Sequence, residues 1–145
     1  MTKIIGDLKV CIDEANMFYD IARDCYNMDI EDYMKKGFYP FVVNVSFACE
    51  LYMKAFMIIH SVNNEFESGH ELGNLFNLLD NDLKEKVKES FEKKYGTGSF
   101  NQFLNDNNNA FIDWRYALEH SVKTNINQFF SFATILKEFV DKNIA

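Results

Sequence analysis

Hydrophobic residues in this chain recur three or four positions apart through most of its length, which is the spacing of one face of an α-helix. The stretches between these segments are short and polar, and their glycine, asparagine and serine residues are typical of turns. The pattern predicts helices over residues 4–28, 38–62, 71–79, 82–94, 100–122 and 125–142. We therefore expect an all-α fold, an up-down bundle of four to five main helices with short connections.

The predicted helix over 38–62 is hydrophobic on nearly every side, whereas the other helices carry a single hydrophobic stripe. A helix that is hydrophobic all round is buried by neighbours on several sides. Pro40 suits its first turn, where the missing N–H is not needed. We expect this helix to lie at the centre of the bundle.

The predicted helix over 100–122 keeps one hydrophobic phase from Phe100 to Val122, although the polar run 105–109 falls in its middle. Aspartate and asparagine prefer caps and turns to helix interiors. The helix either crosses this run or restarts there, with Asp106 or a neighbouring asparagine as its cap. The unbroken phase favours a continuous helix.

Length and composition fit one compact unit. A chain of 145 residues is most simply a single domain, 1–145, and its 48% hydrophobic residues can build a core. Glu50 and Lys54 interrupt the longest hydrophobic stretch and argue against a membrane span, because a charge at the bilayer centre costs about 2.5–3.5 kcal/mol. The N-terminal residues lack the hydrophobic core of a signal peptide. A cytoplasmic location is the resulting expectation.

The net charge of −7 argues against a protein that coats nucleic acid, since such binding depends on a broad basic surface. Any chemistry on nucleic acid must then be local or assisted by a partner. The three cysteines fit a reducing compartment and are expected in the core. Cys11 and Cys25 lie about 21 Å apart on one predicted helix, too far for a disulfide. The histidines fall in three separate segments without metal-ligand spacing, and no glycine-rich phosphate loop occurs, so we expect neither a metal nor a cofactor.

Glu50 and Lys54 lie one turn apart inside the all-hydrophobic helix, and two interpretations stay open. They form an exposed ion pair worth about 0.2–0.5 kcal/mol, or Glu50 is a carboxylate that lines an internal or interfacial groove, because glutamate is seldom buried without a partner. His70 precedes the next predicted helix, and we interpret it as helping the loop enter that helix.

Residues 110–120 interleave polar and hydrophobic side chains most regularly. Phe111 and Trp114 belong to the stripe that faces the core. Another face carries three residues at helical spacing, Asp113, Tyr116 and His120. A structural account explains this pattern: Arg115 pairs with Glu119 one turn later, and His120 lies near a helix C-terminus, where a positive charge is favoured.

Arg115 and His120 also carry the two groups that metal-free RNA cleavage needs. A histidine can take the proton of the 2′-hydroxyl or donate one to the leaving oxygen, and a guanidinium can stabilise the phosphate. On one helix the two residues lie about 140° apart with a rise of about 7.5 Å, so they do not converge on one small target. Two copies of the helix packed antiparallel can set the arginine of one beside the histidine of the other.

Four stretches of the chain resemble the HEPN domain family. Arg115-Tyr-Ala-Leu-Glu-His120 fits the family's Arg-x4-6-His motif. Phe111–Tyr116, followed by Glu119, is similar to the surroundings of that motif in one bacterial branch. Ala48–Lys54 is similar to that branch's central-helix pattern, and Gly69–Phe76 to its short "His-x-Leu…Leu-Phe" element. The matches span about residues 38–122, and the order of helices covers nearly the whole chain.

The resemblance implies a homodimer formed through the 100–122 helix. It also implies a metal-independent endoribonuclease, commonly a toxin or phage-defence component, often paired with a small nucleotidyltransferase-type antitoxin. By position, Arg115 and His120 would be catalytic. Four residues would support the groove: Glu50, Asp113, Tyr116 and Glu119. The alternative is a non-catalytic module of the same family that binds a nucleotide or a partner protein, which the acidic charge, Tyr116 and Val122 favour.

Overall fold

The computed structural model describes residues 3–108 and 125–144, which form helices and one pair of short strands. In chain order the elements are β1 (Lys3–Ile5), α1 (Leu8–Tyr26), α2 (Ile30–Asp32), the π-helical turn η1 (Tyr33–Gly37), α3 (Phe38–His60), β2 (Glu65–Glu67), α4 (Leu72–Asn77), α5 (Asn81–Tyr95), α6 (Ser99–Asn107) and α8 (Ile126–Ile144). The predicted all-α class is confirmed. Every end of four helices, α3, α4, α5 and α8, lies within about two residues of its predicted position.

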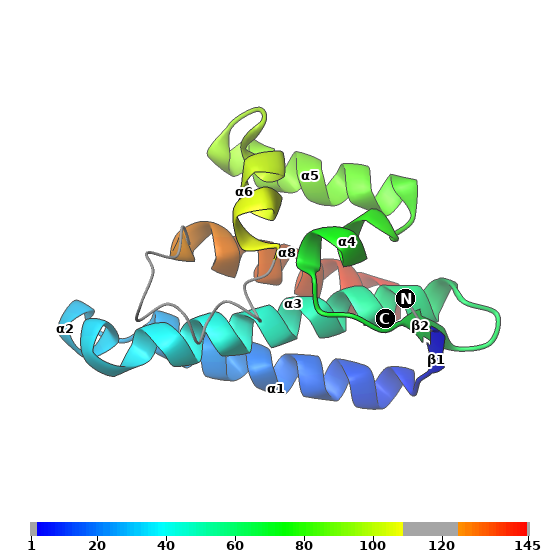
Figure 1. Ribbon diagram of the computed structural model, residues 1–145, viewed down its shortest axis with the longest axis horizontal. Coiled ribbons are helices and arrows are strands. Elements are labelled where there is room, and N and C mark those ends of the chain that lie inside the picture. Colours follow the sequence, from blue (N-terminus) through cyan, green and yellow to red (C-terminus); the bar gives the residue numbers. More distant parts are fainter. Residues whose placement is uncertain (1–2, 109–124, 145) are drawn as a thin grey trace.

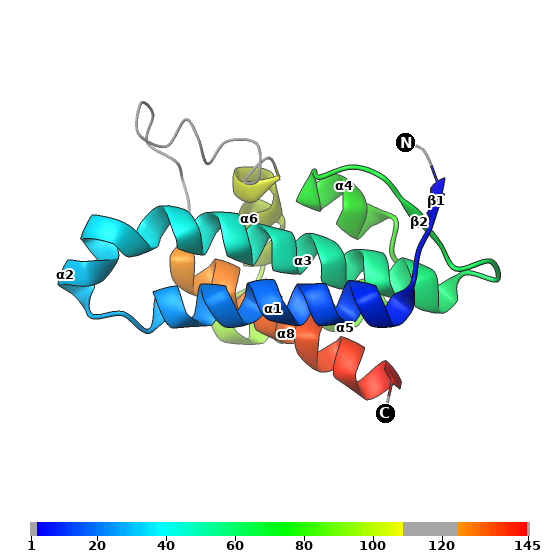
Figure 2. The ribbon, with the colours of Figure 1, turned by 90° about the horizontal axis from the view of Figure 1, so that it is seen from below.

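Helix α3 lies at the centre, as predicted. Helix α1 packs antiparallel along one side of it, and α8 and α4 cover other sides (Figures 1 and 2). Phe41, Tyr52 and Phe56 of α3 are fully buried. The segment Ile30–His60 is long and hydrophobic enough to cross a membrane by length and composition, and 67% of its most hydrophobic window is buried inside the molecule. Burial by α1, α4 and α8 accounts for that composition.

The shorter helices α5 and α6 join the bundle through aromatic rings. Phe103 of α6 lies between Phe91 of α5, at 5.1 Å between ring centroids, and Phe132 of α8, at 5.3 Å. Phe100 packs against the same two rings, at 5.3 and 5.7 Å. Tilted and edge-to-face rings at such distances are the favoured arrangement of buried aromatic side chains. This set of rings is called the aromatic cluster below.

Two stretches differ from the sequence-based expectation because short strands pair at one end of the bundle. The prediction of a helix from residue 4 was wrong, since β1 occupies Lys3–Ile5 and pairs antiparallel with β2, which lies in the predicted polar loop. Asp7 then caps α1 by accepting a hydrogen bond from the Val10 N–H at 3.1 Å. Gly6 fits beneath Phe66, because a Cβ at this position would lie 2.6 Å from the ring.

The stretch between α1 and α3 is helical rather than turn-like. Asp29 caps α2 through the N–H of Asp32, and the turn η1 leads directly into α3. Helix α6 confirms the first part of the predicted helix over 100–122. The rest of that prediction, including the choice between a continuous and a restarted helix, lies outside the described residues.

Candidate functional site

Most of the predicted site lies outside the part of the chain that the structure describes. This applies to five of the predicted residues, Asp113, Arg115, Tyr116, Glu119 and His120. Glu50 is described, and it lies in the buried middle of α3. Glu50 and its neighbours therefore give the structural view of the site.

Glu50 and Lys54 form a buried ion pair. Lys54 Nζ lies 3.1 Å from Glu50 Oε2, and the two residues are only 6% and 5% exposed. This excludes the exposed pair of the first interpretation and places the carboxylate inside the fold. A buried pair gains little net stability, because removing both charges from water costs about as much as their attraction returns. The pair calls for an explanation beyond stability.

His70 is the second partner of the Glu50 carboxylate. His70 Nδ1 lies 2.7 Å from Glu50 Oε1, and the His70 side chain is 52% exposed. An ionised carboxylate only accepts hydrogen bonds, so Nδ1 carries the hydrogen and the neutral ring has its acceptor nitrogen at Nε2. The interpretation of His70 as a loop residue alone missed this contact. Spacing could not have revealed it, because the two residues belong to different elements.

Phe66 of β2 completes the surroundings of Lys54. The ammonium lies 5.5 Å from the centroid of the Phe66 ring, within the range of a cation–π contact. Lys54 thus lies close to both the Glu50 carboxylate and an aromatic ring. Glu50, Lys54, His70 and Phe66 are called the polar cluster below. It connects α3 to β2 and to the loop before α4.

Cysteine thiols do not add a nucleophile to this cluster. Cys11 of α1 donates a hydrogen bond from Sγ to the Leu51 carbonyl at 3.2 Å, and burial raises the pKa of its thiol to about 11. Burial also raises the pKa values of Cys25 and Cys49. A thiol with a raised pKa is a poor nucleophile near neutral pH. Cys25 and Cys49 are buried as predicted, and Cys11 is half-buried at the edge of the core; all three are free.

The residue just before the predicted motif segment caps the helix that follows His70. Asn108 accepts hydrogen bonds at the start of α4, from Leu72 N to its carbonyl at 2.9 Å and from Gly73 N to its Oδ1 at 2.7 Å. A Cβ at Gly73 would lie 2.7 Å from Asn108 Oδ1, so a larger residue there would displace the Asn108 side chain from this hydrogen bond. The chain therefore enters the segment 109–124 from the N-terminal end of α4, two residues beyond His70.

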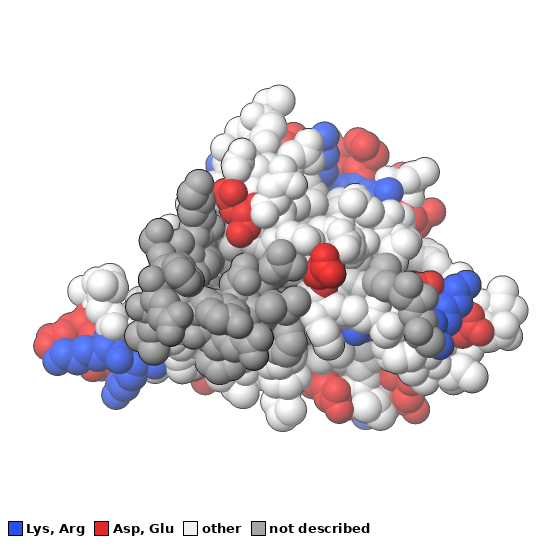
Figure 3. Space-filling view, in the orientation of Figure 1, with Lys and Arg blue, Asp and Glu red and all other residues white. Residues whose placement is uncertain are grey.

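This arrangement suits proton transfer more than metal binding. A carboxylate that holds one ring nitrogen of a histidine fixes the ring's orientation and tautomer, as the orienting acid does in general-base pairs. The described residues contain no group of three or more His, Cys, Asp or Glu residues placed to hold a metal ion. Charge on the surface is mixed: on the described part of the face in Figure 3, Lys and Arg side chains lie in small groups near the edges.

Comparison with known proteins identifies no relative of this chain, so functional inference rests on its sequence motifs, its fold and the site. No model of a protein family matches the chain, and neither a curated protein nor a solved structure is significantly similar to it.

Proposed function

We propose that this protein is a HEPN-like, metal-independent endoribonuclease of toxin or phage-defence type that acts in the cytoplasm as a homodimer. The observation that carries the proposal is the Glu50–His70 contact at 2.7 Å. It joins two of the four stretches in which the sequence resembles the family, Ala48–Lys54 and Gly69–Phe76. The other two stretches lie in the segment that follows Asn108. Asn108 caps α4, the helix that begins two residues after His70.

In the proposed reaction, His120 exchanges a proton with the 2′-hydroxyl or the leaving oxygen of RNA. Histidine suits this task because its ordinary pKa lies near neutrality. Arg115 stabilises the added negative charge on the phosphate through paired N–H donors. Because Arg115 and His120 would diverge around the helix that the sequence predicts for them, each site in this proposal combines residues of two copies. Such a dimer through the 100–122 helix is part of the proposal.

The remaining predicted residues support the groove in this proposal. On the helix predicted from the sequence, Glu119 would lie one turn from Arg115 and would orient its guanidinium. Asp113 and Tyr116 would share the face of His120 on that predicted helix and would contact the substrate or the partner copy. Glu50 would support the groove by holding His70 and Lys54, which lie 2.7 and 3.1 Å from its carboxylate oxygens.

The deciding experiment measures RNA cleavage in the presence of EDTA. Wild type is compared with His120→Ala, Arg115→Ala and Lys93→Ala, the last changing an exposed charge in α5. We expect a loss of about 10²–10⁴-fold for each of the first two and no change for the control. Equal cleavage by wild type and His120→Ala, or none by either, would contradict the proposal.

The mass in solution tests the composite site separately. Light scattering should give a dimer of about twice 17.0 kDa. Mixing His120→Ala with Arg115→Ala protein in equal amounts should restore part of the activity once subunits exchange, because about half of the dimers are then mixed and each mixed dimer has one site without either substitution. A strict 17.0 kDa monomer would remove the composite site.

A non-catalytic HEPN-like module is the second candidate, favoured by the net charge of −7. Such a module would bind a nucleotide or a partner protein, for example a nucleotidyltransferase-type antitoxin. Calorimetry with nucleotides and co-purification with the product of a neighbouring gene distinguish it from the first candidate. Binding without EDTA-resistant cleavage would favour the module, and cleavage without any such partner would count against it.

A further inference from the structure

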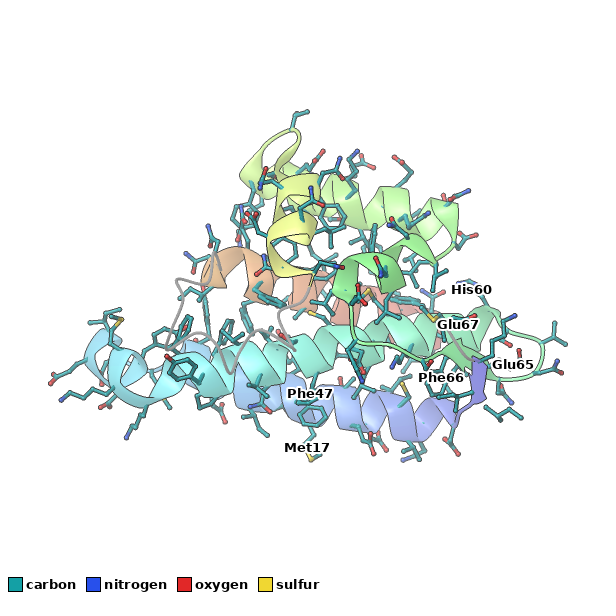
Figure 4. The ribbon with its side chains drawn as sticks, viewed as in Figure 1. Met17, Phe47, His60, Glu65, Phe66 and Glu67 are labelled. Carbon is teal, nitrogen blue, oxygen red and sulfur yellow. The ribbon has the colours of Figure 1, made fainter. Side chains whose placement is uncertain are left out.

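A hollow of about 290 Å³ lies at the end of the bundle where α3 ends. Phe66 is the one residue of the polar cluster that lines it. It is enclosed by the last turns of α3, by β2 and by the turn between α4 and α5. Figure 4 shows His60, Glu65, Phe66 and Glu67 gathered at this end. The proposed ribonuclease uses none of the residues that line it apart from Phe66.

The lining combines a hydrophobic floor with an acidic rim. Phe56, Met57 and Leu79 form hydrophobic parts of the wall. The rim carries three carboxylates, Glu65, Glu67 and Asp80. Lys3 is the one Lys or Arg among the lining residues, so the rim has an excess of two negative charges when His60 is neutral. A pocket of this composition favours a cation that also has a hydrophobic part.

The two strand carboxylates lack partners of their own. Glu65 and Glu67 flank Phe66 in β2, and alternation along a strand puts both on one face. Both are half-buried, yet neither side chain forms a hydrogen bond or ion pair within the described part of the chain. Asp80 differs, because its Oδ2 accepts hydrogen bonds from the backbone at the start of α5. Two half-buried like charges side by side repel each other, and a bound cation would relieve that repulsion.

The strand that carries these carboxylates is held in place. The Glu65 N–H donates to Ser61 Oγ at 3.0 Å, and β2 pairs with β1 over its three residues. Phe66 is fixed between Gly6 and Lys54. In the closed strand pair the two carboxylates are thus positioned for a ligand.

We propose that this hollow is a binding site for a small organic cation, a primary amine with a hydrophobic body. The ammonium lies between Glu65 and Glu67, and the body contacts Met57, Leu78 and Leu79. An anion would meet the excess negative charge of the rim, and a neutral ligand would leave the two negative charges in excess over Lys3 uncompensated. The site is independent of the proposed ribonuclease activity and is tested without RNA.

The test uses phenethylamine as the probe and 2-phenylethanol, its uncharged analogue of similar shape, as the matched ligand. Calorimetric titration of the whole chain should show binding of the amine, and about tenfold weaker or no binding of the alcohol. The affinity for the amine should fall as salt is raised. Absence of amine binding, or equal affinity for the two ligands, would overturn the proposal.

Variants locate the bound amine. Glu65→Gln combined with Glu67→Gln should weaken amine binding about tenfold, whereas Glu85→Gln combined with Glu89→Gln, the same charge change on the exposed face of α5, should leave it unchanged. Equal effects of the two double variants would show attraction by net charge alone and would refute the site. Lys3→Met should strengthen binding, which gives a readout that damage to the fold cannot mimic.

Discussion

The aromatic cluster of α5, α6 and α8 and the polar cluster of α3, β2 and the loop before α4 both contain buried side chains, yet they are built on opposite principles. Phe91, Phe100, Phe103 and Phe132 meet ring to ring and contain no polar atom. In the polar cluster, Glu50 and Lys54 are equally hidden from water but are charged. Burial of rings stabilises the fold directly, whereas burial of charges costs about as much as it returns. The difference indicates that the first cluster holds the molecule together and the second positions chemical groups.

Phe91→Ala should produce a large loss of stability. The Phe91 ring is fully buried and lies within 5.3 Å of Tyr95, Phe100 and Phe103. Its removal leaves a cavity and should lower the free energy of unfolding by about 3–5 kcal/mol, measured by urea denaturation. RNA cleavage per folded molecule should stay close to wild type. A loss below about 1 kcal/mol would mean that the aromatic cluster is not the main source of stability.

Glu50→Gln should affect stability about as much as Phe91→Ala and should affect function more. The amide keeps the size of the side chain but leaves Lys54 buried without its counter-charge, which should lower the free energy of unfolding by about 3–5 kcal/mol. RNA cleavage should fall more than this loss of folded protein explains. Urea denaturation and cleavage at saturating RNA measure the two effects.

A double variant sharpens the same contrast. Glu50→Leu combined with Lys54→Met removes both charges and should recover the stability of wild type, because a buried ion pair can be replaced by hydrophobic residues of similar volume. Activity should not recover. Recovery of activity together with stability would show that the pair serves the fold alone.

His70→Ala should have the smallest effect on stability. The Glu50–His70 contact is charge-assisted, but the His70 ring is 52% exposed, so we expect a loss of about 1 kcal/mol. A double-mutant cycle with Glu50→Gln should return most of that value as coupling energy between the two side chains. Coupling near zero would contradict the cluster as described.

Helical periodicity predicted the parts of the fold that depend on local sequence. Helix α3 was predicted from its uniform hydrophobicity, and α5 from the helical spacing of its hydrophobic residues, which the structure shows as the buried stripe Leu83, Val87 and Phe91. The strands β1 and β2 were missed, because three residues give too short a pattern and each strand forms only against the other.

The polar cluster shows the same limit at the candidate site. Glu50 and Lys54 could be paired from their spacing on one helix, but their burial depends on β2 and the loop around them. His70 reaches Glu50 only through the path of the loop before α4, in which Gly69 has a φ of 123°. Such a contact between residues that are distant in the sequence cannot be predicted from local sequence patterns. The roles of Arg115 and His120 stay predictions that rest on the sequence motif.

The pairing of β1 with β2 has a consequence for the order in which parts of the molecule form and open. β1 precedes α1 and β2 follows α3, and the two strands meet only when these helices pack antiparallel, so closing the pair requires both helices to be packed first. It contains few backbone hydrogen bonds, and its side chains are partly or fully exposed. The strand pair should therefore be the last element to form and an early one to open, with fast hydrogen exchange at its amides. Glu65 and Glu67 belong to this strand pair. Binding at their carboxylates should therefore raise the local stability of the strand pair more than that of the helices.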